Sequence, residues 1–469
     1  AMSTVFFDMS GFRRYLAAHG LPSGIQRVNL MLVLHTAARL GRERVALAFL
    51  DCGSGAYRTL PLSEAPDDLT DLPALARALG LTDARGRRRP TLEKYLDRPG
   101  ARRFHTAMRG LNAALGNERH FARRGGSLAA WRASGRAPSA GPPRRRFDDL
   151  FAHARPGDTL VVLDNAWGDR RIPGMHRRAH EAGLRVVPLV HDLCPVLLPQ
   201  FFTRYNAQRF DDWLRGTTAY ATHYLANSQA TAADLRAFLD AQEVDTPIEV
   251  MPLAQSRLIL PGARPGASAA GAAPPAVAAR RDLSDGVASL AARPFVLCVG
   301  TLEIRKNLWG LAQVWDRLRR DPALDPPRLV LAGRPGWLNE DFERLVAATG
   351  HLGGWLRVLH GPTDAELDHL YRACQFTICV SFKEGWGLPI GESLGYGKTG
   401  VVSGLSSMPE VGGAFVEYCD PHSLSSIEAA CRRLIEDGAR RAELERRIAQ
   451  ARLRSWEDVA GDLVAAIGA

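Results

Sequence analysis

The stretch QFTICVSFKEGWGLPIGESLGYG, residues 375–397, combines a buried strand, a glycine-rich turn and a helix start. Its first residues are apolar enough for a strand inside a parallel sheet. Pro389 suits the first turn of a helix, where a backbone N–H group has no partner within the helix anyway. Glu384 stands directly after the strand, and Glu392 lies eight positions later. A turn needs glycines but not two carboxylates, so this pair indicates a ligand site.

The turn has features that suit an anion and several hydroxyl groups. In an open parallel sheet, ligands bind beyond the carboxyl ends of the strands. Gly385 and Gly387 let the backbone approach a ligand closely, and N–H groups at a helix N-terminus favour an anion. The carboxylates of Glu384 and Glu392 can accept hydrogen bonds from hydroxyl groups. A sugar nucleotide carries both a diphosphate and hydroxyls, so we expect such a ligand.

Positively charged residues for the same ligand follow another predicted strand. In GTLEIRKN, residues 300–307, the strand ends at Gly300, and Arg305 and Lys306 stand where the next helix begins. Cations at a helix N-terminus oppose the helix dipole, so a bound phosphate explains them better than an ordinary exposed pair does. Arg334, in AGRPG, lies at the end of a further strand.

Strand and helix patterns alternate twice along the 469 residues, on either side of a segment rich in Pro, Gly and Ala. A chain of this length exceeds what one hydrophobic core usually supports. The apolar runs that we expect to be strands are 3–10, 44–51, 158–168, 184–195, 247–254, 294–300, 327–336, 355–361 and 375–381. Such alternation favours an α/β protein with a parallel sheet in each half.

These patterns predict two Rossmann-like domains facing across a cleft. The expected limits are 1–255 for the first domain, with an irregular Arg-rich insertion at 60–146, and 293–454 for the second. Residues 256–292 are predicted to form a linker or flexible loop, because they contain few large apolar groups. Residues 455–469 are predicted to form a terminal helix.

The bulk composition, 46% hydrophobic and 23% charged with a mean hydropathy of −0.14, is typical of a soluble globular protein. No run is long and apolar enough to span a membrane, and no signal-peptide pattern starts the chain, so we expect a cytoplasmic protein. The seven cysteines are scattered without a CxxC pair, which favours reduced thiols over disulfides or zinc.

The net charge of +10 is concentrated locally. Several arginines form clusters, namely Arg85, Arg87, Arg88, Arg89, Arg102, Arg103, Arg123, Arg124, Arg144, Arg145 and Arg146. Clusters of this kind suit phospholipid head groups, a pyrophosphate-linked carrier or nucleic acid. They are equally compatible with solvated loops that bind nothing.

Several segments also carry a family resemblance. VGTLEIRKNL, LVLAGRPGW, LHGPTDAELDHLYRAC and SFKEGWGLPIGESLGYGKTGVVSGLSSMPEV resemble the C-terminal half of retaining glycosyltransferases of the GT-B fold, glycosyltransferase family 4. The E-x7-E element is the hallmark of that family. FFDMS, SGIQRV, LVHDLCPVLLPQFF and ANSQATAADL resemble a branch that builds bacterial surface polysaccharides such as capsule and O-antigen, often as mannosyltransferases.

The resemblance implies that the terminal helix 455–469 crosses back to the first domain. It also implies roles for individual residues. Arg305 and Lys306 would bind the donor diphosphate, Glu392 the ribose hydroxyls and Glu384 the transferred sugar. His191 would reach that sugar from the first domain, so the catalytic set is His191, Glu384, Lys306 and Arg305. The donor site would further include Gly300, Thr301, Arg334, Gly385, Trp386, Gly387 and Leu388. On the acceptor side, Gly24 would lie near the reaction centre, and Asp192 would line the site or cap its own loop.

Two departures from the family pattern stand out. Many relatives carry Arg where this chain has Thr301, so the diphosphate clamp is expected to rely more on Lys306. The helix after Glu392 has Gly391 and Gly395, where relatives usually carry a larger residue and Ala, respectively.

The resemblance implies a retaining, metal-independent hexosyltransferase with no cofactor and with GDP-mannose as the favoured co-substrate. No Asp-x-Asp element ends a strand near the expected donor site, in agreement with this expectation. The acceptor would be a glycan or lipid-linked glycan at the inner face of the cell membrane. Because acceptors bind to the first domain in this fold, the Arg-rich segment 60–146 would recognise either an anionic acceptor or the anionic membrane surface.

Two alternative classes stay open. One is another GT-B-like enzyme, such as a sugar-nucleotide epimerase or a phosphorylase, although no segment suggests the lysine that a phosphorylase needs for pyridoxal phosphate. The other is a protein that binds an anionic polymer such as nucleic acid. The arginine clusters lack the interleaved aromatic residues typical of that class.

Overall fold

The computed structural model describes residues 3–19, 24–51, 54–81, 99–122, 128–129, 147–164, 166–257, 284, 287, 290 and 293–469. The chain divides into two units, which we describe separately. The first consists of Ala1–Pro188, Trp213–Thr222 and Ala469, and the second of Leu189–Asp212 and His223–Gly468. These two units do not coincide with the domains expected from the sequence, 1–255 and 293–454. The expected domain limits stay predictions.

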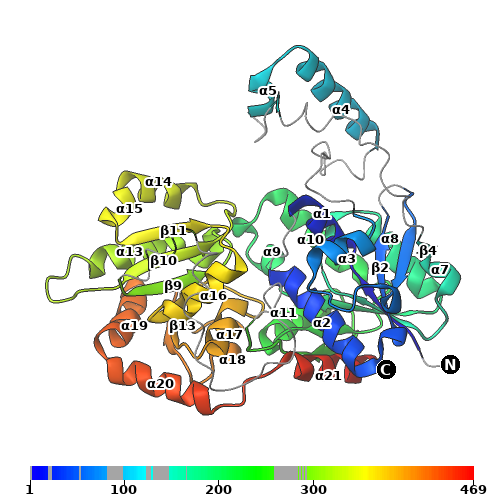
Figure 1. Cartoon of the computed structure of the whole chain (residues 1–469). Coiled ribbons are helices and arrows are strands. Elements are labelled where there is room, and N and C mark those ends of the chain that lie inside the picture. Colours follow the sequence, from blue (N-terminus) through cyan, green and yellow to red (C-terminus); the bar gives the residue numbers. More distant parts are fainter. Residues whose placement is uncertain are drawn as a thin grey trace. The chain divides into compact units, whose positions relative to one another are not determined.

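The first sheet has its strands in the order β4-β3-β2-β1-β5-β6-β7-β8 within the described residues. Figure 1 labels β2 and β4 of this sheet. Their bounds are β1 Val5–Asp8, β2 Val45–Leu50, β3 Tyr57–Pro61, β4 Asp148–Asp149, β5 Thr159–Val162, β6 Arg185–Val190, β7 Tyr224–Ala226 and β8 Ile248–Val250. The six strands β2, β1, β5, β6, β7 and β8 pair in parallel, as the apolar runs predicted. β3 pairs antiparallel with β2 and with the edge strand β4, and neither β3 nor β4 was predicted from the sequence.

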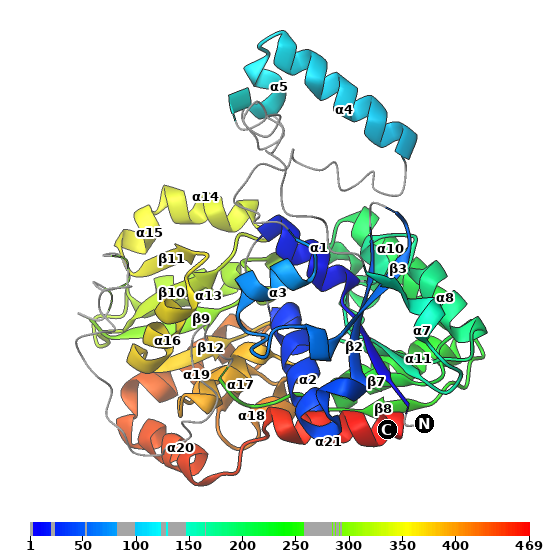
Figure 2. The same ribbon diagram turned by 45° about the vertical axis from the view of Figure 1, so that its right-hand side comes forward.

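Helices follow the strands of the first unit. They are α1 Ser10–His19, α2 Gly24–Leu40, α3 Leu72–Ala78, α4 Pro99–Ala114, α5 Glu118–Ala122, α7 Leu150–His153 and α8 Ile172–Glu181. Asp71 caps α3 by accepting a hydrogen bond from the N–H group of Ala74, at 2.9 Å. The segment 60–146 is therefore not irregular throughout, and Figure 2 shows α4 and α5 in cyan. Most of its arginine clusters lie outside the described residues.

The second sheet is parallel, with its strands in the order β11-β10-β9-β12-β13-β14 in the part of the chain that is described. The bounds are β9 Phe295–Val299, β10 Arg328–Gly333, β11 Leu356–His360, β12 Phe376–Cys379, β13 Gly400–Ser403 and β14 Glu417–Cys419. Val296 and Cys298 of β9 enter one hydrophobic core, and Phe295 and Leu297 enter another. Because successive residues of a strand point to opposite faces, the sheet is buried on both sides, as its apolar runs predicted.

The second unit contains most of the remaining helices. They are α9 Cys194–Leu197, α11 Gln229–Asp240, α13 Leu308–Leu318, α14 Glu340–Ala348, α15 Gly350–Gly353, α16 Asp364–Ala373, α17 Leu388–Gly395, α18 Met408–Gly412, α19 Leu424–Glu436, α20 Gly438–Gln450 and α21 Trp456–Ile467. The helix α10, Arg204–Thr217, spans the division between the units. Among the described residues, no helix has both the length and the apolar character needed to cross a bilayer.

One finding corrects the expected extent of the linker. Val287 and Leu290 were assigned to the linker 256–292, but they are buried in the core beside β9, and Ser284 donates to Glu366 at 2.7 Å. Most of the predicted linker lies outside the described residues. The predicted terminal helix is present as α21, whereas its crossing to the first domain stays a prediction.

Candidate active site

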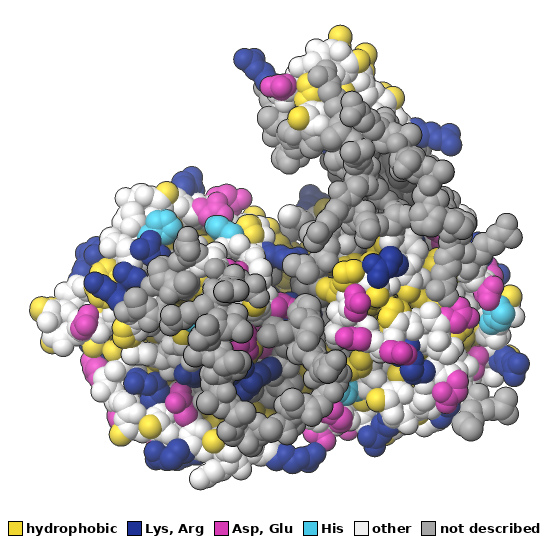
Figure 3. Space-filling model, in the orientation of Figure 1, with side chains coloured by type: hydrophobic (Ala, Val, Ile, Leu, Met, Phe, Trp, Pro, Cys, Tyr) yellow, Lys and Arg dark blue, Asp and Glu magenta, His cyan; other side chains and the backbone are white. Residues whose placement is uncertain are grey.

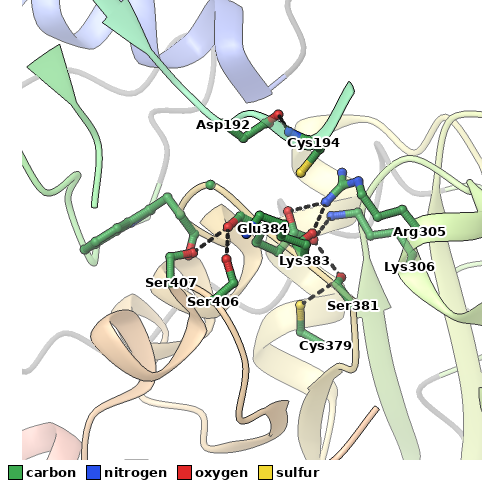
Figure 4. A network of polar contacts seen from close by, with 12 residues as sticks. Asp192, Cys194, Arg305, Lys306, Cys379, Ser381, Lys383, Glu384, Ser406 and Ser407 are labelled. Atoms are coloured by element: carbon green, nitrogen blue, oxygen red, sulfur yellow. Dashed lines mark hydrogen bonds and ion pairs between the residues drawn. The ribbon is translucent and has the colours of Figure 1, made fainter. Parts of the chain in front are cut away.

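The site lies where β9 and β12 end, side by side, in the second unit. The two strands pair in parallel, and β9 has β10 on its other side. β12 has β13 on its far side, so the chain leaves β9 and β12 in opposite directions, and ligands of open α/β sheets bind beyond the carboxyl ends of strands at such a point. A 3₁₀ turn, Ile304–Lys306, follows β9, and the turn of residues 381–388 follows β12. Residues 78 positions apart in the sequence meet here, as Figure 4 shows.

Two cations and two carboxylates form the centre of the site. Arg305 places Nη1 2.9 Å from Oε2 of Glu384, and Lys306 places Nζ 2.5 Å from Oε1 of the same carboxylate. Nη2 of Arg305 lies 2.6 Å from Oε1 of Glu303. Ser381 donates its hydroxyl to Oε1 of Glu384 at 2.6 Å. The charged side chains are at most 12% exposed, so this four-charge cluster is largely shielded from water.

The cluster shifts the pKa values of its members. Burial alone raises the pKa of Glu384, but the charges of Arg305 and Lys306, with hydrogen bonds from Lys306 and Ser381, lower it to about 2. Burial raises the pKa of Glu303, and the charge of Arg305 opposes this only in part. Burial lowers the pKa of Lys306, but the Glu384 carboxylate outweighs it and leaves that pKa above its ordinary value. Glu384 and Lys306 are thus ionised at neutral pH.

Hydroxyl groups hold the carbonyl side of the turn. Ser406 and Ser407 donate to the carbonyl of residue 384 at 2.7 and 2.9 Å, and Ser407 also reaches the carbonyl of residue 386 at 3.1 Å. Ser228 and Thr231, at the start of α11, donate to the carbonyl of residue 385 at 2.7 and 3.2 Å. Three successive carbonyl oxygens are therefore occupied, which fixes the direction of the peptide planes.

The N–H groups of Gly385, Trp386, Gly387 and Leu388 have no hydrogen-bond partner among the described residues. Gly387 precedes α17 with a φ of 95°, a conformation that favours glycine, and no side chain caps this helix. The first N–H groups of a helix carry partial positive charge and lack partners within the helix. The turn thus presents a row of donors suited to phosphate or sugar oxygens.

Glu392 lies half-buried in the first turns of α17. Its Oε2 accepts a hydrogen bond from the hydroxyl of Tyr371 at 2.7 Å. Tyr371 stacks on Tyr396, with ring centroids 4.9 Å apart and planes 7° from parallel. The stack supports the Tyr371 ring, and the hydrogen bond from its hydroxyl orients the Glu392 carboxylate.

The glycines in α17 that depart from the family pattern have a packing reason. A Cβ atom on Gly391 would lie 3.0 Å from the carbonyl oxygen of Ala254, and one on Gly395 would lie 2.7 Å from the backbone nitrogen of Arg257. The backbone of residues 254–257 therefore occupies the space that a larger side chain would need.

The remaining donor-side predictions fall at neighbouring strand ends. Gly300 has a φ of 144°, and a Cβ atom there would lie 3.3 Å from Cε of Lys306. The half-buried Thr301 follows it. The carbonyl of Arg334, just after β10, accepts from the N–H group of Leu302 at 2.8 Å, so these two strand ends meet. The roles assigned to these residues stay predictions.

The structure brings part of the predicted acceptor side to the same turn. The carbonyl of His191, directly after β6, lies so close to Gly385 that a Cβ atom there would be 1.8 Å from it. Asp192 accepts from the N–H group of Cys194 at 2.9 Å, so it caps its own loop, one of its two expected roles (Figure 4). Gly24 is the exposed first residue of α2 in the first unit, and its role stays a prediction.

A second polar cluster, not predicted from the sequence, lies at the carboxyl ends of β1 and β5 in the first unit. Asp8 places Oδ2 2.5 Å from Nε2 of His176. Asn29 donates to Oδ2 of Asp164 at 2.9 Å. Burial, with the nearby charge of Asp8, raises the pKa of Asp164 to about 7.

The serines and Thr231 around the turn were also missed. They occur in the segments SGLSSMPEV and ANSQATAADL, but residue order alone does not show which carbonyl a hydroxyl reaches. Among the described residues, no group of three or more His, Cys, Asp or Glu side chains is arranged to hold a metal ion. The expectation of a metal-independent reaction stays a prediction.

Comparison with known proteins finds a family model that matches part of the chain. Residues 281–452 match the family described as "Glycosyl transferases group 1". O-antigen chain mannosyltransferase B of Escherichia coli is 36% identical over 170 residues, which cover 36% of this chain and 44% of the relative. The GDP-mannose:cellobiosyl-diphosphopolyprenol alpha-mannosyltransferase of Xanthomonas oryzae pv. oryzae is 31% identical over 115 residues, 24% of this chain and 29% of that protein. The chain thus matches less than half the length of these curated relatives.

A crystal structure of Anabaena HepE in complex with UDP and glucose superposes on the whole chain with a TM-score of 0.57 at 13% identity, covering 100% of both chains. At this identity the likeness concerns the fold alone. Together with the two α/β sheets, it confirms the expected GT-B fold.

Proposed function

The chain carries a domain of the glycosyl transferases group 1 family on a GT-B fold, and from this premise we propose that it is a retaining hexosyltransferase. It would move mannose from GDP-mannose to a glycan or lipid-linked glycan in bacterial surface polysaccharide synthesis. The observation that carries the proposal is the buried cluster of Arg305, Lys306 and Glu384 beside the row of unpartnered N–H groups before α17. The choice of mannose and of its GDP carrier rests on the two mannosyltransferases that the chain resembles.

In this proposal each part of the site binds one part of the donor. Arg305 and Lys306 bind the diphosphate, because guanidinium and ammonium groups form strong charge-assisted hydrogen bonds with phosphate oxygens. The N–H groups of residues 385–388 bind phosphate and sugar oxygens. Glu384 accepts hydrogen bonds from the hydroxyls of the transferred sugar, and Glu392 accepts from the ribose.

The reaction replaces one bond at the anomeric carbon by another. The acceptor hydroxyl attacks that carbon on the face from which the diphosphate leaves, so the anomeric configuration is retained. The bond from carbon to phosphate oxygen breaks, and the acceptor proton passes to a leaving phosphate oxygen. The products are the new glycoside and a nucleoside diphosphate. Arg305, Lys306 and the helix N-terminus stabilise the charge that develops on the diphosphate without a metal ion in this proposal.

The test is a thermal-shift screen of nucleoside diphosphates and nucleotide sugars on three proteins. Wild type, Glu392→Ala and the control Glu443→Ala on α20 are compared. GDP is expected to stabilise wild type and control, and the loss of a charged hydrogen-bond acceptor should weaken binding about tenfold or more in Glu392→Ala. Absence of any shift with GDP or GDP-mannose would contradict the proposed donor.

A second assay separates the transferase from an epimerase. GDP-mannose consumption is followed with and without a mannose-containing glycan or lipid-linked glycan. A transferase forms a longer glycan with retained configuration, whereas an epimerase consumes the donor without any acceptor. Donor consumption that does not respond to acceptor would favour the epimerase.

A further inference from the structure

The helix α4 carries a stripe of large apolar side chains on one exposed face. Phe104, Met108, Leu111 and Leu115 are 62%, 38%, 54% and 72% exposed. Their spacing of four, three and four residues places them on the same side of a helix. Leu115 follows the last helical residue and continues the turn, because its N–H group donates to the carbonyl of Leu111 at 3.0 Å. We call these four residues the α4 stripe.

The α4 stripe is not the side on which the helix packs within the described residues. Ala113 is buried and forms a small core with Phe121 and Leu128. Ala113 lies nine residues after Phe104, which is half a turn away from the stripe at 100° per residue. A surface helix of a globular protein normally turns its large apolar residues to the core. Here the small residue faces inward and the large ones face out, as expected for a helix that contacts a partner.

The charge around the α4 stripe points to the nature of that partner. The sequence contains no acidic residue from 98 to 117, and Arg103 and His105 flank Phe104 in the sequence and the stripe on the helix surface. Residues 85–146 contain 17 arginines and lysines against three acidic residues, a net charge of +14, whereas the rest of the chain carries −4. Figure 3 shows yellow hydrophobic and dark blue basic side chains together on the segment of α4 and α5.

These observations argue against two kinds of partner for the α4 stripe. A second copy of the chain would bring an equally basic segment to the stripe, and like charges repel. A polyanion such as nucleic acid would satisfy the arginines but leave the large apolar side chains in water. An anionic lipid bilayer offers phosphate groups and acyl chains together, which is the environment that basic amphipathic helices bind.

We propose that α4 lies in the surface layer of an anionic lipid bilayer. The α4 stripe enters the boundary between head groups and acyl chains, and the arginines around it contact lipid phosphates. The proposal extends the proposed function to the place where the enzyme works, since a lipid-linked acceptor is membrane-bound. It concerns binding alone, so its test needs neither donor nor acceptor.

The test is co-sedimentation of the full chain with two kinds of vesicle. One contains phosphatidylcholine alone, and the other contains phosphatidylcholine mixed with phosphatidylglycerol. The variant Leu111→Ser/Leu115→Ser removes half of the stripe, and Trp309→Ser, on α13 in the other unit, is the control for an exposed apolar residue. Thermal unfolding of each protein checks that the substitutions leave the fold intact, as expected for exposed positions.

We expect wild type and Trp309→Ser to sediment with the phosphatidylglycerol vesicles at low salt, and much less with phosphatidylcholine alone. The double variant should bind about tenfold or more weakly, because each leucine withdraws a large apolar side chain from water on binding. Equal binding of the double variant and wild type would overturn the proposal. A wild type that binds no anionic vesicle at low salt would also overturn it. So would a wild type that binds no vesicle but forms a dimer, if the double variant is a monomer.

Discussion

Replacing Glu384 by Gln tests the centre of the site, because it removes one charge and keeps the shape of the side chain. In the wild type this 8% exposed carboxylate neutralises Lys306 and shares Arg305 with Glu303. The difference between the ordinary glutamate pKa of 4.5 and the folded value of about 2 corresponds to about 3 kcal/mol. Removing one partner of a buried ion pair costs a similar amount. We therefore expect Glu384→Gln to lose about 3 kcal/mol of folding stability at neutral pH.

The pH dependence of this loss has a definite sign. The pKa of Glu384 is lower in the folded than in the unfolded state, so the carboxylate stabilises the fold fully above about pH 4.5 and ceases to do so as pH falls towards 2. Urea unfolding midpoints of wild type, Glu384→Gln and the control Glu443→Gln, measured over a pH series, check this. A variant as stable as wild type at pH 7, or a stability gap that does not shrink in acid, would refute the reasoning.

Ligand binding separates the role of Glu384 from its structural contribution. The substitution leaves Lys306 without its anion, so a nucleoside diphosphate should bind Glu384→Gln at least as well as wild type. Transfer from the nucleotide sugar should fall at least tenfold, because the proposed acceptor for sugar hydroxyls has lost its charge. Isothermal titration with GDP and a transfer assay with GDP-mannose measure the two effects. Equal loss of both would contradict the assignment of Glu384 to the sugar.

The remaining predictions concern the turn and the first unit. Ser228→Ala removes the 2.7 Å hydrogen bond to the Gly385 carbonyl and should raise the KM for the donor up to about tenfold, with partial rescue by Ser228→Thr. Gly385→Ala would place a methyl group 1.8 Å from the His191 carbonyl and should abolish transfer in a direct activity assay. Asp164→Asn should gain stability relative to wild type as pH rises from about 4 through 7, because deprotonation of this buried group disfavours folding; melting temperatures on both sides of pH 7 test it.

The parts of this structure that the sequence predicted are those encoded locally. The runs FVLCV and FTIC contain only residues suited to a buried parallel strand, and both strands are where the runs predicted them. The turn after β12 was equally readable, because its glycines, Pro389 and the two glutamates lie within a dozen residues. The ion pair of Lys306 with Glu384 could only be inferred indirectly, from the rule that neighbouring strand ends meet.

Other features depend on contacts that residue order does not reveal. The antiparallel strand β3, Tyr57–Pro61, pairs with β2, but Pro61 and the arginine-rich sequence beyond it concealed the pattern of a strand. Asp164 falls within the predicted strand 158–168, and only its hydrogen bond from Asn29 and the nearby charge of Asp8 reveal the environment of this buried carboxyl group. Glu303 was overlooked because a single acid before two cations has no distinctive spacing. Its neutralisation of Arg305 follows from the fold of the 3₁₀ turn.

The charge balance of the cluster links the turn to the strength of donor binding. Arg305 and Lys306 are already paired with Glu303 and Glu384, so in the proposed function a diphosphate would gain less from these cations than it would from two unpaired ones. The additional attraction must come from groups that no carboxylate occupies, and the N–H groups of residues 385–388 are such groups. Their direction is held by the hydroxyls on the opposite side of the turn. In the proposed function the serines would therefore contribute to anion binding indirectly, by holding the direction of these N–H groups.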